Sequence, residues 1–205
     1  MTATPPRPVT AITQRRDLTG PPHDETRDAL DTRLAAMVAA AGGVPAPVPS
    51  GLGAEGLAHW LDAIRPRALI LSGGADPGRD AVRDMLEAAL LDHAEAAPLP
   101  VLGLCRGMQV MARRAGGALA PVGGHVATRH RLSGTLDHEV NSFHAMTLDG
   151  CPPGYRVLAT APDGAIEAIA HETLPWEGWM WHPEREDRAD PRDMARLREV
   201  LTCGH

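Results

Sequence analysis

Aromatic residues and cysteines are scarce in this 205-residue chain, and both shortages limit what it can be. Phe, Trp and Tyr supply 3% of the sequence against 43% hydrophobic residues overall, so Leu, Val, Ile, Met and Ala must fill most of the core. The three cysteines cannot all pair within one chain, and none lies in a CxxC motif. This pattern is typical of a reduced protein, and we expect a cytoplasmic location.

Long apolar runs and excess positive charge are also absent. No apolar run approaches the roughly 20 residues that span a bilayer, and residues 1–8 lack the apolar segment of a secretory signal. The formal net charge is −6, which gives no general attraction to nucleic acid or anionic membranes. We therefore expect a small-molecule substrate, no nucleic-acid partner and no membrane association.

The hydrophobic pattern predicts a flexible tail at residues 1–8 and one domain over residues 9–205. Through residue 117 strands and helices alternate, which favours an α/β fold with a mainly parallel sheet flanked by helices. Strands are expected at residues 9–13, 44–49, 68–71 and 101–104. Helices are expected at residues 54–64, 80–96 and 106–115, after a first helix that starts at Asp24 and ends before Gly42-Gly43.

Beyond Gly117 the helical pattern stops. Residues 121–138 look like a loop, and short strands are expected at residues 139–143, 155–161, 165–170 and 178–182. Asp190 followed by Pro191 predicts the start of a last helix, because proline is favoured at the first helical position. The C-terminal third is therefore predicted to add short antiparallel strands to the sheet.

The most informative stretch is Leu102-Gly103-Leu104-Cys105-Arg106-Gly107, a G-x-C-x-G sequence between a predicted strand and a predicted helix. A sharp strand-to-helix turn would lift the Cys105 side chain into the open, and the flanking glycines remove Cβ atoms that would clash there. The sulfur would lie at a helix N-terminus, where the helix dipole favours thiolate. We expect Cys105 to be a nucleophile with a lowered pKa; the alternative is a buried structural cysteine.

A base and a group that orients it are both available near the end of the chain. His182 ends a strand-like apolar segment, and Glu184 lies two residues later. On an extended backbone these two side chains point the same way, so the carboxylate would hold the imidazole in one tautomer. The alternative is a surface histidine beside an unrelated glutamate.

Acyl transfer also needs two N–H donors aimed at the developing oxyanion. The backbone N–H of Arg106 directly follows the nucleophile and is the first expected donor. The second is expected from Ser72-Gly73-Gly74, at the end of a neighbouring strand, with Gly74 as the donor because glycine allows close backbone approach. The alternative for this loop is a plain tight turn.

Taken together, LSGGADP, GLCRGMQ, VNSFH, APDGAIEAI and WHPE resemble, in order and spacing, the class I glutamine amidotransferases. The resemblance is closer to the γ-glutamyl hydrolase branch, the peptidase C26-like enzymes, and covers about residues 9–202. It implies a flavodoxin-like fold and a triad of Cys105, His182 and Glu184 that hydrolyses a γ-glutamyl amide through a thioester, without a cofactor. The resemblance also implies a set of residues that bind the glutamyl group: Gly73, Gln109, Asn141, Ser142 and His144.

The N-terminal half resembles the amidotransferase-like proteins of capsular phosphoramidate synthesis, through ITQR at residues 12–15 and RDALD at residues 27–31. That resemblance implies a γ-glutamyl-CDP-amidate hydrolase, whose nucleotide would need cations near the site. The expected cations, which could equally be solvated surface side chains, are Arg15, Arg16, Arg27, Arg106 and Arg129. ALAPV at residues 118–122 replaces the Gln-His pair common in the family, which argues against γ-aminobutyrate as the leaving group.

Other interpretations remain open at this stage. The chain could be a glutaminase subunit that passes ammonia to a synthase partner, a γ-glutamyl-γ-aminobutyrate hydrolase, a homodimer, or a non-catalytic regulatory protein. The spacing of His125, His130 and His138 matches no standard zinc pattern, so no metal site is predicted. Cys151 and Cys203 are expected to have no catalytic role, and Arg106 either lines the pocket or anchors the turn.

Overall fold

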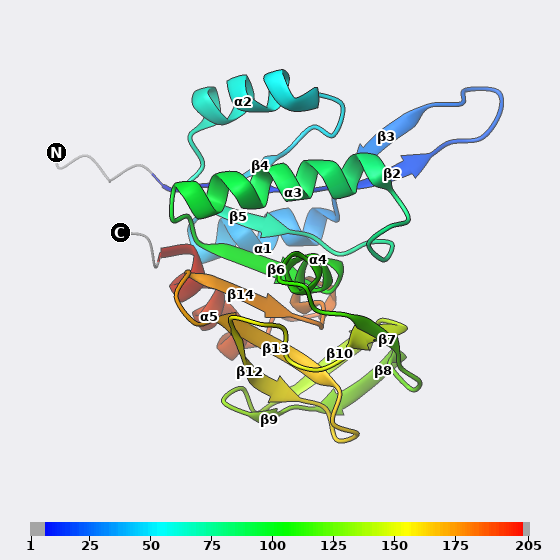
Figure 1. Ribbon diagram of the computed structural model, residues 1–205, viewed down its shortest axis with the longest axis vertical. Helices are drawn as coiled ribbons and strands as arrows, with labels where there is room; N and C mark the ends of the chain where they lie inside the picture. Colours follow the sequence, from blue (N-terminus) through cyan, green and yellow to red (C-terminus); the bar gives the residue numbers. More distant parts are fainter. Residues whose placement is uncertain (1–6, 203–205) are drawn as a thin grey trace, which may run out of the picture.

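The computed structural model describes residues 7–202, so most of the predicted tail, together with Cys203, lies outside the described residues. Its centre is an eight-stranded sheet in the order β4-β1-β5-β6-β14-β13-β12-β9 (Figure 1). The first five strands are parallel, and the last three run antiparallel to their neighbours. The parallel strands are β1 (Val9–Ile12), β4 (Val44–Pro47), β5 (Ala68–Leu71), β6 (Val101–Leu104) and β14 (Trp176–Trp179).

In chain order, these five parallel strands lie in the sequence 2-1-3-4-5, which is the flavodoxin-like order that the family resemblance implies. β5 and β6 are buried at every position, as expected for parallel strands covered on both faces. The strand order reverses between β1 and β5, so the loops after these two strands diverge at this point and leave a crevice.

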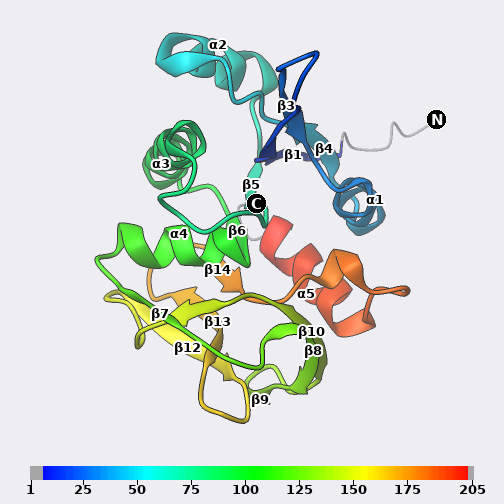
Figure 2. The ribbon, with the colours of Figure 1, turned by 90° about the vertical axis from the view of Figure 1, so that its right-hand side faces the viewer.

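Five helices of the described chain cover the two faces of the sheet (Figure 2). Leu57, Leu90 and Met111 are among the side chains that pack one face, and Leu34 and Leu197 pack the other. The first face carries α2 (Gly53–Ile64), α3 (Ala81–Ala96) and α4 (Arg106–Arg114). The opposite face carries α1 (Thr32–Ala41) and α5 (Pro191–Thr202). No helix within residues 7–202 combines the length and apolarity needed to cross a bilayer.

The C-terminal third contains more strand than the sequence predicts. Residues 121–138 were expected to be a loop, but half of them lie in strands that pair with later segments, and the expected strand at 178–182 ends at Trp179. These polar segments form strands because they pair with segments distant in the sequence. Their own residues give little local indication of a strand. The predicted strands are present as β10 (Glu139–Phe143), β12 (Tyr155–Thr160) and β13 (Ile166–His171). The strands that were not predicted are β7 (Leu119–Pro121), β8 (Val126–Arg131), β9 (Ser133–Gly134) and β11 (Met146–Leu148).

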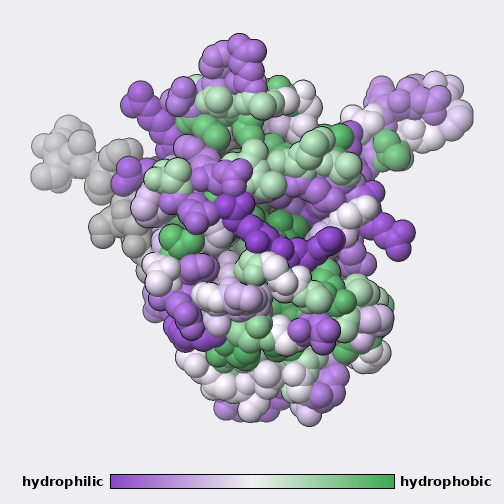
Figure 3. Space-filling view, in the orientation of Figure 1, coloured by the Kyte–Doolittle hydropathy of each residue, from purple (hydrophilic) through white to green (hydrophobic). Residues whose placement is uncertain are grey.

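The first helix also begins later than predicted. Asp24 has a φ of 45°, a left-handed conformation that places it in the turn of a hairpin and prevents it from capping a helix. The hairpin joins β2 (Arg15–Leu18) to β3 (Thr26–Ala29) and projects from the body with a mostly hydrophilic surface (Figure 3). The N-cap of α1 is Asp31, whose carboxylate accepts the backbone N–H of Arg33.

The sheet ends at β4, which pairs with β1 on one side only. The backbone N–H groups of Val44 and Val48 donate to the carbonyls of Pro8 and Ile12, so alternate residues of this segment face β1. The residues between them that face away from the sheet are Pro45 and Pro47. This edge strand matches the expected Pro-interrupted segment, because proline is tolerated where no ladder hydrogen bond is required.

We predict that Asp31→Ala lowers the free energy of unfolding by about 1 kcal/mol, because an N-cap side chain contributes about that much. Chemical denaturation of the variant beside the wild-type chain measures the difference. Asp24→Asn is the matched control and should change stability little, since asparagine tolerates the left-handed turn position. A larger loss for the Asp24 variant would contradict the observed start of α1.

Candidate active site

Cys105 lies in the sharp turn between β6 and α4 with a φ of 48° and a ψ of −103°, a conformation that side chains other than glycine rarely adopt. Its backbone N–H donates to the carbonyl of Trp179 at 2.7 Å. A Cβ atom at Gly103 would lie 2.6 Å from the backbone of Gly107, and one at Gly107 would overlap the carbonyl oxygen of Leu71. Both flanking glycines are therefore required by close packing, as the G-x-C-x-G motif predicts. We call this turn, residues 103–107, the elbow.

His182 reaches the same end of the sheet from the neighbouring strand. β14 pairs with β6 in parallel register, with Trp179 opposite Leu104, and His182 follows three residues later. Its Nδ1 lies 2.7 Å from Oε1 of Glu184, and both side chains are buried. The contact forms through a 3₁₀ turn at Pro183–Arg185 and not through the extended backbone that the sequence predicts. The turn brings the carboxylate back to the imidazole, which leaves Nε2 as its free nitrogen.

Asn141 holds the backbone of His182 in place from the strand β10. Its side-chain amide donates to the His182 carbonyl at 2.7 Å, and its side-chain oxygen accepts the His182 N–H at 2.9 Å. The same amide also donates to Glu186. The contacts of Asn141 within the described residues thus position the base, and a contact with substrate stays a prediction.

The loop at residues 72–74 is fixed by a buried arginine. Arg83 donates to the carbonyls of Ser72 and Gly73 at 2.6 and 3.0 Å. Because the N–H and C=O of a trans peptide point in opposite directions, the Gly74 N–H points away from Arg83. A Cβ at Gly73 would overlap the His182 imidazole, so this glycine lets the loop pack on the base. These contacts are consistent with an oxyanion loop, while the donor role of Gly74 stays a prediction.

The side chain of Arg106 anchors the elbow to α3. It forms ion pairs with Glu87 and Asp84 and is almost completely buried. Of the two alternatives for this side chain, the structure favours anchoring, although Arg106 also borders a cavity. The backbone N–H of Arg106 interacts with the Cys105 sulfur and favours its thiolate form. This position agrees with the donor role expected for the N–H that follows the nucleophile.

Burial raises the pKa of the Cys105 thiol to about 12, which corrects the lowered value expected from the sequence. The backbone N–H of Arg106 and the charge of Arg185 act in the opposite direction, but they do not outweigh the loss of water. Cys105 is therefore a neutral thiol at rest. If Cys105 is the nucleophile, as the sequence predicts, a base must therefore remove its proton, and His182 is the predicted base.

The remaining predicted substrate residues are buried and hydrogen-bonded to the protein. Gln109 donates to the carbonyl of Met146 at 3.2 Å, while its side-chain oxygen has no partner among the described residues. Ser142 donates to the carbonyl of His125, and Nδ1 of His144 donates to the Met146 carbonyl. Their contact with a glutamyl group stays a prediction. Gln109 is the one of the three with a buried, unused acceptor.

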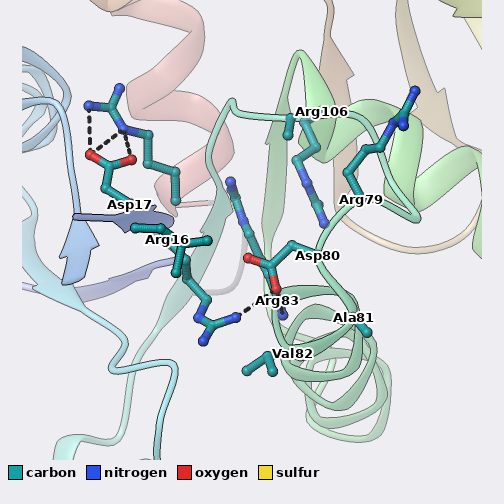
Figure 4. Close-up of a pocket in the computed structure, with 11 residues that line it drawn as sticks. Arg16, Asp17, Arg79, Asp80, Ala81, Val82, Arg83 and Arg106 are labelled. Atoms are coloured by element: carbon teal, nitrogen blue, oxygen red, sulfur yellow. Dashed lines mark hydrogen bonds and ion pairs between the residues drawn. The ribbon is translucent and has the colours of Figure 1, made fainter. Parts of the chain in front are cut away.

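A cavity of about 460 Å³ is lined by Ala75, which directly follows the loop at residues 72–74, and by Arg106 of the elbow (Figure 4). It lies at the carboxyl ends of β1 and β5, where the strand order reverses and where open α/β sheets bind ligands. Five arginines and two aspartates line it: Arg15, Arg16, Arg79, Arg83, Arg106, Asp17 and Asp80. The cavity therefore has an excess of positive charge in a chain that is acidic overall.

The arginines expected from the sequence to act as cations are paired with carboxylates. Arg15 pairs with Asp17 and Arg16 with Asp80, while the arginines outside the cavity pair with Glu25, Glu139 and Glu186. Arg79, which was not among the expected cations, forms no side-chain hydrogen bond or ion pair within residues 7–202 and lines the cavity. Arg83 was not expected either, although its i,i+4 spacing to Glu87 could have indicated an ion pair.

The chain matches a known protein family over most of its length. The family model described as peptidase C26 matches residues 8–131 and 123–184. The chain belongs to the peptidase C26 family. The class I glutamine amidotransferase-like resemblance seen in the motifs is thereby confirmed, and the triad positions lie within or at the end of the matched segments.

Individual relatives agree with this assignment. A subunit of the glutamine-hydrolyzing GMP synthase of Methanothrix thermoacetophila is 35% identical over 126 residues, which cover 57% of this chain and 66% of that protein. γ-Glutamyl-CDP-amidate hydrolase of Campylobacter jejuni is 30% identical over 127 residues, covering 59% and 64%. The chain thus spans slightly less than two thirds of either relative.

A solved structure confirms the α/β fold of this peptidase C26 member. A GMP synthase subunit of Thermoplasma acidophilum aligns with a TM-score of 0.71, over 96% of this chain and 95% of that chain. The sequence identity is 18%, so the likeness concerns the fold alone.

We predict that Gly73→Ala lowers the rate of γ-glutamyl amide hydrolysis by about 10²-fold, the loss expected when a catalytic group moves by about 1 Å. The added methyl group would displace the imidazole of His182. Steady-state kinetics and thermal unfolding measure activity and folding separately. Gly51→Ala is the control, because a Cβ there meets no atom and activity should not change.

The raised pKa of Cys105 predicts how its alkylation depends on pH. In a Cys151→Ser, Cys203→Ser chain, the rate of iodoacetamide labelling at Cys105 should rise steadily up to pH ~10, because the thiolate fraction still increases below a pKa of about 12. Mass spectrometry of the labelled peptide follows the rate. A plateau between about pH 7 and 9 would instead indicate the lowered pKa expected from the sequence.

Proposed function

We propose that this chain is a γ-glutamyl hydrolase in which Cys105 attacks the amide carbonyl of the substrate. His182 takes the thiol proton as the carbon–sulfur bond forms, while Glu184 accepts the Nδ1–H and stabilises the imidazolium. The tetrahedral intermediate collapses to a γ-glutamyl thioester as His182 returns the proton to the departing nitrogen. Water then attacks the thioester, loses a proton to His182, and releases glutamate with the thiol restored.

The observation that carries this proposal is the joining of the elbow to the base by short backbone contacts. Cys105 is hydrogen-bonded to β14 at Trp179, and the same strand leads into the His182–Glu184 turn. The loop at residues 72–74, which follows the neighbouring strand β5, packs on the His182 imidazole. Three adjacent strands thus supply the nucleophile, the base with its carboxylate, and the expected oxyanion loop.

The leaving group is proposed to be anionic, because the arginine-lined cavity adjoins the loop at residues 72–74. Its position at the strand reversal suits a nucleotide, and Arg79, which has no ion-pair partner among residues 7–202, suits a phosphate. The relative from Campylobacter jejuni is named a γ-glutamyl-CDP-amidate hydrolase. We accordingly propose a γ-glutamyl nucleotide phosphoramidate as the substrate, with a cytoplasmic location.

A second candidate is a glutaminase subunit that delivers ammonia to a synthase. The similarity to the GMP synthase subunit of Methanothrix thermoacetophila over 57% of the chain favours it. The two candidates share the triad chemistry and differ in the leaving group, which is ammonia in this case. A synthase partner would then have to cover the mouth of the site to retain the ammonia, whereas the first candidate needs no partner.

A substrate panel tests the proposed chemistry and separates these candidates. The purified chain is assayed with glutamine, γ-glutamyl-γ-aminobutyrate and a γ-glutamyl cytidine diphosphoramidate, and we expect the last to have the highest kcat/KM. Cys105→Ser should abolish turnover while binding persists. Turnover retained by that variant would refute the nucleophile, and glutamine as the best substrate would support the glutaminase.

Arg79→Ala tests the leaving-group cavity. We expect KM for the nucleotide substrate to rise roughly tenfold or more, because a charge-assisted hydrogen bond contributes about that much, with little change for glutamine. Arg156→Ala, an exposed arginine on β12 at the other side of the sheet, is the matched control. Equal effects of the two variants would contradict the assignment of the cavity.

A further inference from the structure

Three histidines converge on one buried carboxylate in the C-terminal third of the fold. Oε1 of Glu167, on β13, lies 3.2 Å from Nδ1 of His125, 3.4 Å from Nε2 of His130 and 3.3 Å from Nε2 of His144. His125 and His144 also face each other, with 3.2 Å between the same two nitrogens. We call these four side chains the His₃Glu cluster.

The cluster contains buried polar atoms that the described part of the protein does not satisfy. The Glu167 side chain is 0% exposed, and neither of its carboxylate oxygens has a hydrogen-bond partner among residues 7–202. Nε2 of His130 is buried and also lacks one there. The approaches of 3.2–3.4 Å therefore do not have hydrogen-bond geometry. Buried polar groups without partners are costly, and a carboxylate is the most costly of them.

Two of these histidines use the ring nitrogen that faces away from Glu167, the outer nitrogen, in a hydrogen bond. That bond shows which ring nitrogen carries the proton and which one, the inner nitrogen, has the lone pair. Nδ1 of His144 lies 3.0 Å from the carbonyl of Met146, which can only accept, so this nitrogen carries the proton. Nε2 of His125 lies 3.0 Å from the carboxylate of Asp163 and is protonated for the same reason. In the neutral form of each ring, the inner nitrogen then presents a lone pair to Glu167.

Neutral rings would thus point lone pairs at a carboxylate, an arrangement that requires a cation between them. An outer N–H bound to a carboxylate or to a backbone carbonyl is the usual support of a metal-ligating histidine. The ligand atoms of His125, His130 and Glu167 all lie within 4.8 Å of one another. Each histidine nitrogen, that of His144 included, lies 3.2–3.4 Å from the Glu167 oxygen, and donors about 2.1 Å from a tetrahedral zinc lie roughly 3.4 Å apart. Imidazole and carboxylate donors suit zinc and its neighbours in the first transition row.

We propose that His125, His130, His144 and Glu167 bind one divalent transition-metal ion, with Zn²⁺ the best fit. All four donors come from the protein, which is typical of a structural zinc site and leaves no open position for substrate. His125, His130 and His138 were considered together on the basis of the sequence. His138 lies elsewhere in the structure and pairs with Asp193. Spacing alone could not add His144 and Glu167 to the group, because later segments of the chain contribute them.

The metal would position the catalytic base through the strand β10. His144 directly follows β10, and its N–H donates to the carbonyl of His125. Asn141, on the same strand, holds the backbone of His182 at both its N–H and its carbonyl. Metal binding would thus fix β10 against β13 and so support the backbone of His182. The metal itself would not contact the substrate.

Metal analysis of the purified chain tests the proposal. After incubation with ZnCl₂ and dialysis, plasma mass spectrometry should find one Zn²⁺ per chain, retained in a Cys105→Ser, Cys151→Ser, Cys203→Ser variant. Co²⁺ in place of zinc should give visible absorption typical of four nitrogen and oxygen ligands. Absence of stoichiometric metal would show that the cluster is held by protons alone and would overturn the proposal.

Three variants and a control test the ligands and their support. Glu167→Gln and His130→Asn should each weaken Zn²⁺ binding by more than 100-fold, and Asp163→Asn by roughly 10–100-fold, as expected for a group that supports a ligand. The partly exposed His130 serves if the Glu167 variant does not fold. His59→Asn, an exposed histidine on α2, should have no effect. Unchanged affinity in the His130 variant, or metal lost with the cysteines, would refute the site. These readouts do not depend on turnover, so they stand apart from the proposed function.

Discussion

The candidate active site depends on the interactions of one buried carboxylate, that of Glu87. It forms ion pairs with Arg83 and Arg106 and accepts a hydrogen bond from Thr13. Arg83 holds the loop at residues 72–74, and Arg106 belongs to the elbow. Removing one partner from such a buried network leaves an uncompensated charge and costs about 3–5 kcal/mol. One helix, α3, thus holds together two segments of the candidate active site.

Two different sheets contribute to the candidate site. The parallel half of the eight-stranded sheet ends in the elbow and in the loop at residues 72–74, whose positions are set by close packing of glycines on their neighbours. The two-stranded sheet of β8 and β10, which is separate from the eight-stranded sheet, supports His182 through Asn141. The proposed metal cluster joins β13 of the eight-stranded sheet to the segments around β8 and β10. A metal there would add its binding free energy to the stability of the fold.

Sequence patterns predicted those features that depend on neighbouring residues. The buried runs β5 and β6, the glycine-flanked Cys105, and α2, α3 and α4 all lie close to where the periodicity placed them. The pairings of β7 and β8 were missed because each depends on a partner that is distant in the chain. For the same reason no local pattern indicated that Arg83 or Glu87 would support the site.

The pKa of Cys105 illustrates a further limit of prediction from the sequence. Its position at a helix N-terminus is readable from the motif, but the degree to which neighbouring strands remove it from water is not. Burial outweighs the dipole here because the desolvation of a thiolate acts on the whole charge, whereas the dipole contributes only a partial one. The His182–Glu184 contact was anticipated, while the turn that creates it was not.

The prolines of β4 have a consequence for association between molecules. Because Pro45 and Pro47 occupy the outward-facing positions, this free edge of the sheet offers carbonyl acceptors but no N–H donors to an approaching strand. The opposite edge is β9, only two residues long. The β4 border is therefore a poor template for the addition of a foreign strand, a route by which proteins with free sheet edges aggregate. The protein gains resistance to self-assembly by edge pairing from its backbone chemistry, without using surface charge for the purpose.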